Sequence, residues 1–141
     1  MSNTLALTNP NDRRADEMLP AFVCSWTDGG RDAAWVHVTG DLDLAAAPQL
    51  EWTLREAALQ ARLVVLDLRE LGFMDSAGVK AIVDASIRAR RDGRRLLLLR
   101  GPPNVDRVFA LTASSDKVEI GDLARGEPAL RVLLQGQSGG A

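Results

Sequence analysis

The chain has 141 residues, of which 46% are hydrophobic and 26% charged, and this length and composition fit one globular domain. The formal net charge of -2 gives no reason to expect nucleic acid or an anionic membrane as the main partner. Cys24 is the only cysteine, which excludes an internal disulfide and a cysteine-based zinc cluster.

The two ends of the chain are predicted to be flexible tails. Residues 1–20 are polar and unpatterned, and residues 136–141 are rich in glycine. The first of these tails lacks the basic start and continuous apolar run of a signal peptide, and the apolar runs elsewhere are too short to span a bilayer. We therefore expect one domain at 21–135 and a cytoplasmic location.

The first half of the domain predicts two strands, a helix and a third strand. The β-prone runs at 21–26 and 33–38 flank the turn residues Asp28-Gly29-Gly30, which is typical of a hairpin. From Ala47 to Ala61, apolar residues recur at helical spacing, with proline in the first turn. The continuous apolar run at 62–68 indicates a strand buried on both faces.

The second half repeats this alternation. A helix follows Ser76 and ends at Asp92-Gly93, and its predicted apolar face comprises Val79, Ile82, Val83 and Ile87. The later segments are a buried strand, a short helix, a short strand and a closing helix, at 94–100, 102–111, 117–120 and from about Pro128. The order ββαβαβαβα predicts a single α/β domain whose mixed, mainly parallel β-sheet is packed with α-helices.

The stretch GFMDSAGVK, residues 72–80, admits several interpretations. Asp75 or Ser76 can cap the following helix, because the first N–H groups of a helix lack partners. A serine nucleophile is disfavoured: Met74 stands where a G-x-S-x-G elbow has glycine, and His37, the only histidine, alternates with valines in a strand. A phosphate loop is disfavoured because no glycine-rich segment of that type follows a strand. Phosphorylation of Ser76 is compatible with a helix N-terminus and would add charge to the surface.

Three other features have a functional and a structural interpretation. Trp52 lies almost opposite the apolar stripe of its predicted helix, so it is either an exposed partner contact or an indole packed over a neighbour. The arginines between Arg88 and Arg100 indicate a solvated helix end rather than a nucleic-acid site, since no aromatic residues are interleaved with them. Cys24 fits a packed strand residue better than a redox sensor.

Three stretches together resemble the STAS domain of bacterial anti-sigma factor antagonists. VTGDLD at 38–43 resembles the loop after the second strand, and VVLDLRELGFMDSAG at 64–78 resembles the family signature. PPNVDRVFALT at 102–112 resembles the P-x-V-x-R-x-F helix. The resemblance covers residues 21 to 135 and implies a STAS fold, no enzymatic activity, no cofactor and no metal.

The resemblance also implies a partner-switching function. The unphosphorylated form would bind an anti-sigma factor, which is also an ATP-using serine kinase, and so release a sigma factor. The kinase would phosphorylate Ser76 and the complex would dissociate, after which a metal-dependent serine phosphatase would restore binding. No direct contact with nucleic acid and no membrane insertion are expected. The expected partner-binding residues are Asp41, Asp43, Asp75, Ser76, Ala77, Gly78, Lys80 and Trp52. For Asp43 and Asp75, the alternative role is to stabilise the loop and to cap the helix.

One departure from the family pattern leaves a second function open. Where the signature commonly continues G-L-G, this chain has Gly78-Val79-Lys80. Lys80 lies four residues after Ser76 on the same helical face, where its ammonium group could pair with a phosphate. The alternative function is a non-switching STAS module, either a scaffold in a stress-signalling assembly or an accessory subunit of a membrane lipid transporter.

Overall fold

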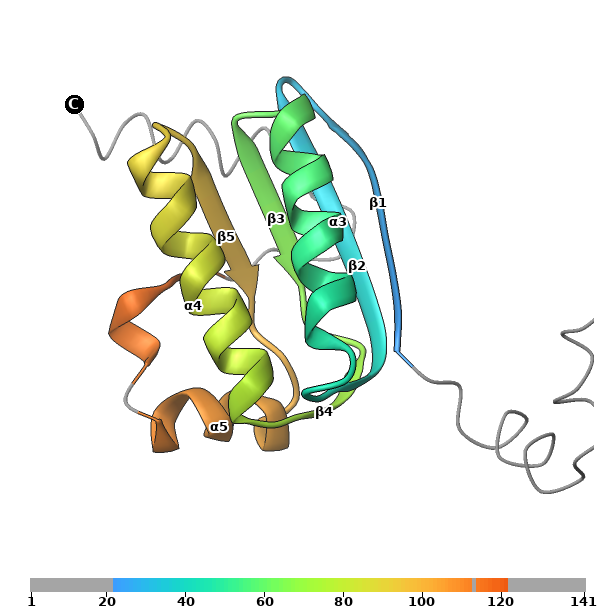
Figure 1. Cartoon of the computed structure of the whole chain (residues 1–141), viewed down its shortest axis with the longest axis vertical. Coiled ribbons are helices and arrows are strands. Elements are labelled where there is room, and N and C mark those ends of the chain that lie inside the picture. The colour runs from blue at the N-terminus through green and yellow to red at the C-terminus, as the bar shows by residue number, and fades with distance from the viewer. Residues whose placement is uncertain (1–21, 113, 122–141) are drawn as a thin grey trace, which may run out of the picture.

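The computed structural model describes residues 22–112 and 114–121 (Figure 1). The predicted tails at 1–20 and 136–141, and the closing helix expected near Pro128, lie outside the described residues. The elements in chain order are β1 (Val23–Gly30), β2 (Ala33–Leu42), α3 (Ala47–Gln60), β3 (Leu63–Asp67), β4 (Leu71–Met74), α4 (Ser76–Arg91), β5 (Arg95–Leu99), α5 (Pro103–Leu111), η1 (Ser115–Lys117) and β6 (Glu119–Gly121).

The strands form a mixed, mainly parallel sheet. Its order is β1-β2-β3-β5-β6, and β4 pairs with the end of β2. Only the pairing of β1 with β2 is antiparallel; the other described pairings are parallel. The predicted fold class is confirmed. Strand β4 was not predicted, because four residues are too few to show the alternation by which a strand is recognised in a sequence.

The turn of the β1–β2 hairpin lies later than predicted. Arg31 and Asp32 form it, with φ values of 47° and 64°. Left-handed conformations at both central residues are what a two-residue hairpin loop requires, because they match the twist of the strands. The predicted turn residues, Asp28-Gly29-Gly30, belong instead to the irregular end of β1, where the Gly30 N–H donates to Asp28 Oδ1 at 2.8 Å.

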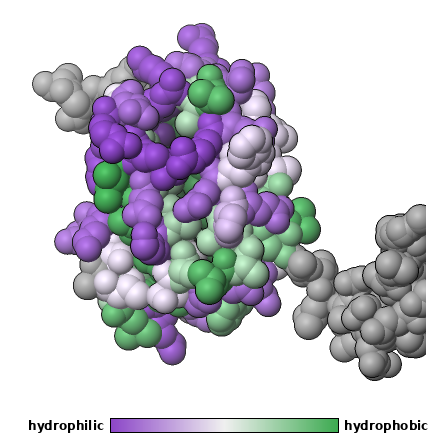
Figure 2. Space-filling view, in the orientation of Figure 1, coloured by the Kyte–Doolittle hydropathy of each residue, from purple (hydrophilic) through white to green (hydrophobic). Residues whose placement is uncertain are grey.

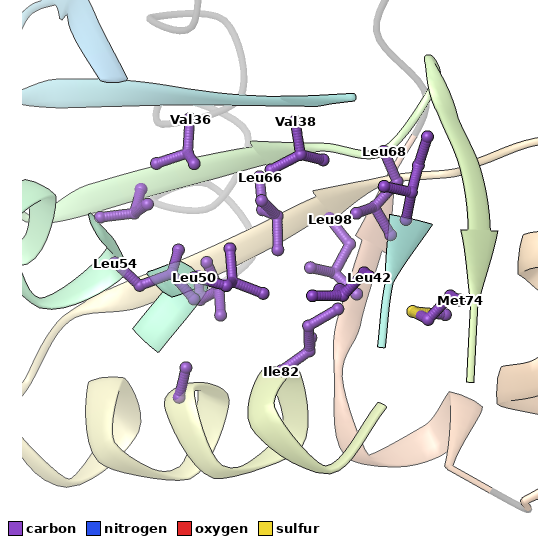
Figure 3. Close-up of a cluster of buried hydrophobic side chains, with 14 of the residues drawn as sticks. Val36, Val38, Leu42, Leu50, Leu54, Leu66, Leu68, Met74, Ile82 and Leu98 are labelled. Atoms are coloured by element: carbon purple, nitrogen blue, oxygen red, sulfur yellow. The ribbon is translucent and has the colours of Figure 1, made fainter. Parts of the chain in front are cut away.

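Helices α3 and α4 cover one face of the sheet, and α5 lies across the end at which α4 begins (Figure 1). Figure 3 shows side chains from the strands pointing toward side chains from both helices, including Val36, Val38, Leu66, Leu98, Leu50, Leu54 and Ile82. The apolar stripe predicted for α3 is therefore confirmed.

The apolar face predicted for α4 is partly wrong. Val79 and Ile82 are buried and Val83 is half-buried, whereas Ile87 is 47% exposed. Ile87 follows Ile82 by five residues, which places it about 140° further round the helix. Small residues take the buried side in its place, among them Ala81, Ala85 and Ser86.

The opposite face of the sheet is also buried. Its cluster is formed by alternate residues of β2, β3 and β5, namely Ala33, Leu63, Val65, Leu97 and Leu99. Strands β3 and β5 are thus covered on both faces, as their continuous apolar runs predicted. Across residues 22–112 and 114–121, no helix has both the length and the apolar run that a membrane crossing requires.

Candidate functional site

The pairing of β4 with β2 brings two of the recognised motifs together. Asp41 lies opposite Phe73 in the register, and the Asp75 N–H donates to the carbonyl oxygen of Leu42 at 3.2 Å. The side chain of Asn104, at the start of α5, donates to the carbonyl oxygen of Gly72 at 2.8 Å. All three motifs therefore meet at the carboxyl end of the parallel strands, which is where sheets of this kind carry their sites.

Asp75, and not Ser76, caps helix α4. Asp75 Oδ1 accepts hydrogen bonds from the N–H groups of Ala77 at 2.9 Å and Gly78 at 3.3 Å. Ser76 is the first residue of the helix and is exposed. Its hydroxyl has no hydrogen bond to any of the described residues. Of the two caps that the sequence allowed, the structure uses the aspartate, which leaves the Ser76 hydroxyl available for chemistry.

The other two carboxylates of the site differ in their contacts. Asp43 is half-buried, and its Oδ1 accepts from the Ala46 N–H at 3.0 Å, while its carbonyl oxygen accepts from the Ala47 N–H at 3.0 Å. Asp43 and Asp75 therefore both have the loop and cap role that was the alternative to partner contact. Asp41 is exposed, and its side chain has no hydrogen bond or ion pair within the described part of the chain. Its carboxylate is the one of the three with no structural task.

Gly78 lies beneath the surface of the site. A Cβ atom at this position would be 2.8 Å from both Leu42 Cγ and Met74 Cγ. Such a distance is too short for carbon atoms, so the first turn of α4 can approach the ends of β2 and β4 only with glycine here. Gly78 is buried, whereas Ala77 is half-buried at the surface, and a partner contact at either position stays a prediction.

Lys80 is bound to the next turn of its own helix. Its Nζ lies 2.8 Å from Asp84 Oδ2, four residues toward the C-terminus. The hydrogen bond and charge of Asp84 raise the pKa of Lys80, so the ammonium form is favoured. In the unmodified protein Lys80 therefore pairs with Asp84, and reaching a phosphate on Ser76 would require it to leave this partner.

Two exposed apolar side chains flank the site and were missed from the sequence. Phe73 on β4 is 46% exposed, and Leu44, directly after Asp43, is 75% exposed. Hydrophobic residues gather toward the end of this face where β4 and α4 begin (Figure 2). Exposed apolar side chains beside polar groups are typical of protein-binding surfaces. Strand alternation would have placed Phe73 on the same face as the buried Leu71, so its exposure could not be found from the pattern of β4 alone.

Trp52 does not belong to this cluster. It is 64% exposed, as predicted, but it lines a cleft between α3 and α4 together with Arg88 and Arg94. Of the arginines near it, Arg95 pairs with Glu119. Arg100, beyond the other end of β5, pairs with Asp106.

The remaining candidate residues have structural surroundings. His37 is exposed on β2 and stacks on Trp35. Cys24 is half-buried, and burial raises the pKa of its thiol, which opposes reactivity. Where the structure describes the chain, no three His, Cys, Asp or Glu side chains are grouped so that they could hold a metal ion.

Comparison with known proteins identifies the family. Residues 26–119 match the family model described as "Mlab, STAS domain". The chain is 30% identical over 86 residues to the anti-sigma-B factor antagonist of Listeria monocytogenes, which covers 60% of this chain and 75% of that protein. It is 26% identical over 91 residues to the anti-sigma-B factor antagonist of Bacillus subtilis, covering 64% of this chain and 84% of the relative.

Solved structures agree on the fold. The anti-sigma factor antagonist SpoIIAA in its unphosphorylated form has a TM-score of 0.65 and 22% identity, covering 78% of this chain and 96% of that one. The phosphorylated form of SpoIIAA from Bacillus has a TM-score of 0.62 and 21% identity, covering 78% and 99%. The chain therefore belongs to the STAS domain family.

Proposed function

We propose that this protein is an anti-sigma factor antagonist and that phosphorylation of Ser76 switches its binding off. The names of the Listeria and Bacillus relatives support the general role. The observation that carries the switch is the division of tasks at the start of α4, where Asp75 caps the helix and Ser76 is exposed with an unbonded hydroxyl. A kinase could modify this hydroxyl without first breaking a bond that holds the fold.

The reaction proposed is phosphoryl transfer from ATP. Ser76 Oγ attacks the γ-phosphorus, an O–P bond forms, and the bond to the β,γ-bridging oxygen breaks, so that ADP leaves. The hydroxyl proton passes to a base of the kinase. ATP, the metal ions and the base all belong to the kinase, which is also the anti-sigma factor. This chain is the substrate and binding partner, and a separate serine phosphatase removes the phosphate by hydrolysis.

The structure provides a reason for the phosphate to act on the partner rather than on the fold. Phosphoserine carries roughly -1.5 to -2 charges at neutral pH. At the start of α4, however, the N–H groups of Ala77 and Gly78 already bind the Asp75 side chain, and the Val79 N–H donates to the Asp75 carbonyl oxygen at 3.2 Å. With these donors occupied, the phosphate stays at the surface, close in sequence to the exposed Phe73. A partner docked there would have to desolvate the new charge.

Two measurements test this proposal. The first is the intact mass of the protein purified from its own cells, with fragmentation to locate any phosphate, and with Ser76→Ala as the control. The second compares wild type, Ser76→Ala and Ser76→Asp as baits for the anti-sigma factor. We expect phosphate on Ser76 alone. We also expect the partner to bind wild type and Ser76→Ala and to be lost with Ser76→Asp.

Other outcomes would contradict the switch. Phosphate at another residue, or equal partner binding by all three baits, would remove Ser76 from the mechanism. Absence of phosphate under both growth and stress conditions would favour the second candidate, a non-switching STAS module that acts as a scaffold or as an accessory transporter subunit. We further propose that the protein works in the cytoplasm, where an ATP-using kinase has its co-substrate.

A further inference from the structure

A cleft of about 500 Å³ lies between α3 and α4, beside the later turns of α4. On the face formed by these helices, hydrophilic residues surround a hollow (Figure 2). Arg88, on its rim, is twelve residues after Ser76 along α4, which corresponds to about 18 Å of helix rise. The cleft is therefore separate from the surface around Ser76.

The floor of the cleft is apolar. Leu54 and Val64 are buried there, from α3 and β3, and Leu96 of β5 is buried beside them. Ala58 and Ala85 line the cleft from the two facing helices, and these short side chains leave the space between α3 and α4 unfilled. A concave site of a few hundred cubic ångströms with an apolar lining is typical of small-molecule sites.

The rim carries cations that have no structural partner. The side chains of Arg55 and Arg88 have no hydrogen bond or ion pair to any other residue in the described ranges, and both line the cleft. Arg94, which also lines it, donates from Nη1 to the Ala61 carbonyl oxygen at 3.4 Å. Glu56 and Asp92 are the acidic residues of the lining. Of the six ionised side chains that line the cleft, four are therefore positive, and one of these four, Arg95, pairs with Glu119.

The end of helix α4 does not need these arginines as caps. The carbonyl oxygen of Arg88 accepts from the Asp92 N–H at 3.0 Å, and that of Ala89 accepts from the Arg94 N–H at 2.7 Å. Arginines near a helix C-terminus commonly balance the partial charge of unbonded carbonyl groups. Here backbone donors already satisfy carbonyl groups of the last turn, so the guanidinium of Arg88 remains free to bind an anion.

We propose that this cleft binds an amphipathic anion. The apolar chain or ring would lie on the floor between the two helices, with the indole of Trp52 against its exposed side. The carboxylate or phosphate group would be held at the rim by the guanidinium groups of Arg88 and Arg55. A guanidinium group can donate two parallel hydrogen bonds to a carboxylate or to a phosphate. The structure therefore assigns a negative charge and an apolar part to the ligand, and the experiment distinguishes the two anions.

The test is an NMR titration of the full chain labelled with ¹⁵N. Decanoate and decyl phosphate, below their micelle concentrations, are the two probes, and they distinguish a carboxylate from a phosphate ligand. We expect saturable shifts at the amides of Ala58, Ala85 and Ala89. Decyltrimethylammonium has a similar chain and the opposite charge, and acetate and inorganic phosphate have no chain. We expect no saturable shifts with any of these three.

Variants then show which side chains contribute to the affinity for the probe. Arg88→Ala should weaken binding of the better probe by about tenfold, because it removes a charge-assisted hydrogen bond. Arg91→Ala, on the exposed side of the same helix and outside the cleft, should leave the affinity unchanged. Ala89→Leu should abolish binding by filling the hollow. Equal binding of the cationic and anionic probes, equal affinities for Arg88→Ala and Arg91→Ala, or no saturable shift with either anionic probe would overturn the proposal.

Discussion

At the scale of single residues, the start of α4 assigns one task to each position. Asp75 binds the free N–H groups of the helix, Ser76 is exposed, and Gly78 allows the close approach to Leu42 and Met74. The motif D-S-A-G was predicted as a site, but the sequence alone could not decide between Asp75 and Ser76 as the cap. That choice depends on backbone angles: Asp75 is extended, with φ of -111°, and Ser76 is already helical.

Gly78→Ala should destabilise the protein. Its Cβ atom would be 2.8 Å from side-chain carbons of the core, and overpacking of this kind typically costs about 1–3 kcal/mol. The higher helix propensity of alanine returns about 1 kcal/mol, so we expect a net loss of about 1 kcal/mol in the free energy of unfolding by urea. Gly72→Ala is the control, because a Cβ atom there would meet its nearest neighbour at 3.5 Å. Equal stabilities of the two variants would contradict the packing argument.

Lys80→Gln should sharpen the proposed switch. The Lys80–Asp84 pair is exposed, so its loss should hardly change stability. In the phosphorylated protein, the Lys80 ammonium group can leave Asp84, pair with the phosphate on Ser76 and partly neutralise its charge. Removing the ammonium group should then increase the ratio of partner affinities between unmodified and phosphorylated protein, by up to about fivefold. Calorimetric titration of both forms measures this ratio, with Lys117→Gln as the control. An unchanged ratio would show that Lys80 does not contact the phosphate.

At the scale of elements, the spacing of apolar residues correctly predicted the helices and strands that are long enough to show a pattern. The stripe of α3 and the doubly buried runs of β3 and β5 extend over several residues, and their positions were correct. Strand β4 has four residues, and its pairing with β2 is a tertiary contact that no local pattern records. The sequence therefore predicted Ser76 as a site residue but missed Phe73, whose exposure depends on that pairing.

Phe73→Ala should weaken binding of the anti-sigma factor by about tenfold or more, because exposed aromatic residues near the centre of an interface are frequent anchors. The control is Ile87→Ala, because Ile87 on α4 has nearly the same exposure, 47% against 46%, and lies three turns beyond Ser76. Surface plasmon resonance with the immobilised partner measures both affinities. If both variants lose the same affinity, or neither loses any, Phe73 is not part of the docking surface.

At the scale of the whole molecule, a polar network is set into the second face of the sheet. Asp67, at the end of β3, accepts hydrogen bonds from Arg69 and from Trp35 Nε1, the latter at 3.3 Å. Burial raises the pKa of Asp67, but the hydrogen bonds and the charge of Arg69 lower it by more, so the pKa lies below its ordinary value. In the sequence, Asp67 is a charged residue within an apolar run. Nothing in that pattern indicated that Arg69 and Trp35 bind its carboxylate.

The lowered pKa of Asp67 predicts a pH dependence of stability. A carboxylate whose pKa is depressed in the folded state stabilises that state above its unfolded pKa of about 4, and the contribution is lost as the pH falls through the folded pKa. The free energy of unfolding of wild type should therefore fall more steeply below about pH 4 than that of Asp67→Asn. Urea denaturation at successive pH values measures both slopes, and parallel curves would contradict the assignment.

The cap at Asp75 has a consequence for how this protein can fail. Because the fold does not use the Ser76 hydroxyl, we expect Ser76→Ala to fold as stably as wild type and to escape degradation. Under the proposed function, such a change would yield an antagonist that is abundant, intact and permanently active. The defect would be visible as a sigma factor that is never silenced, in a cell whose level of this protein is normal.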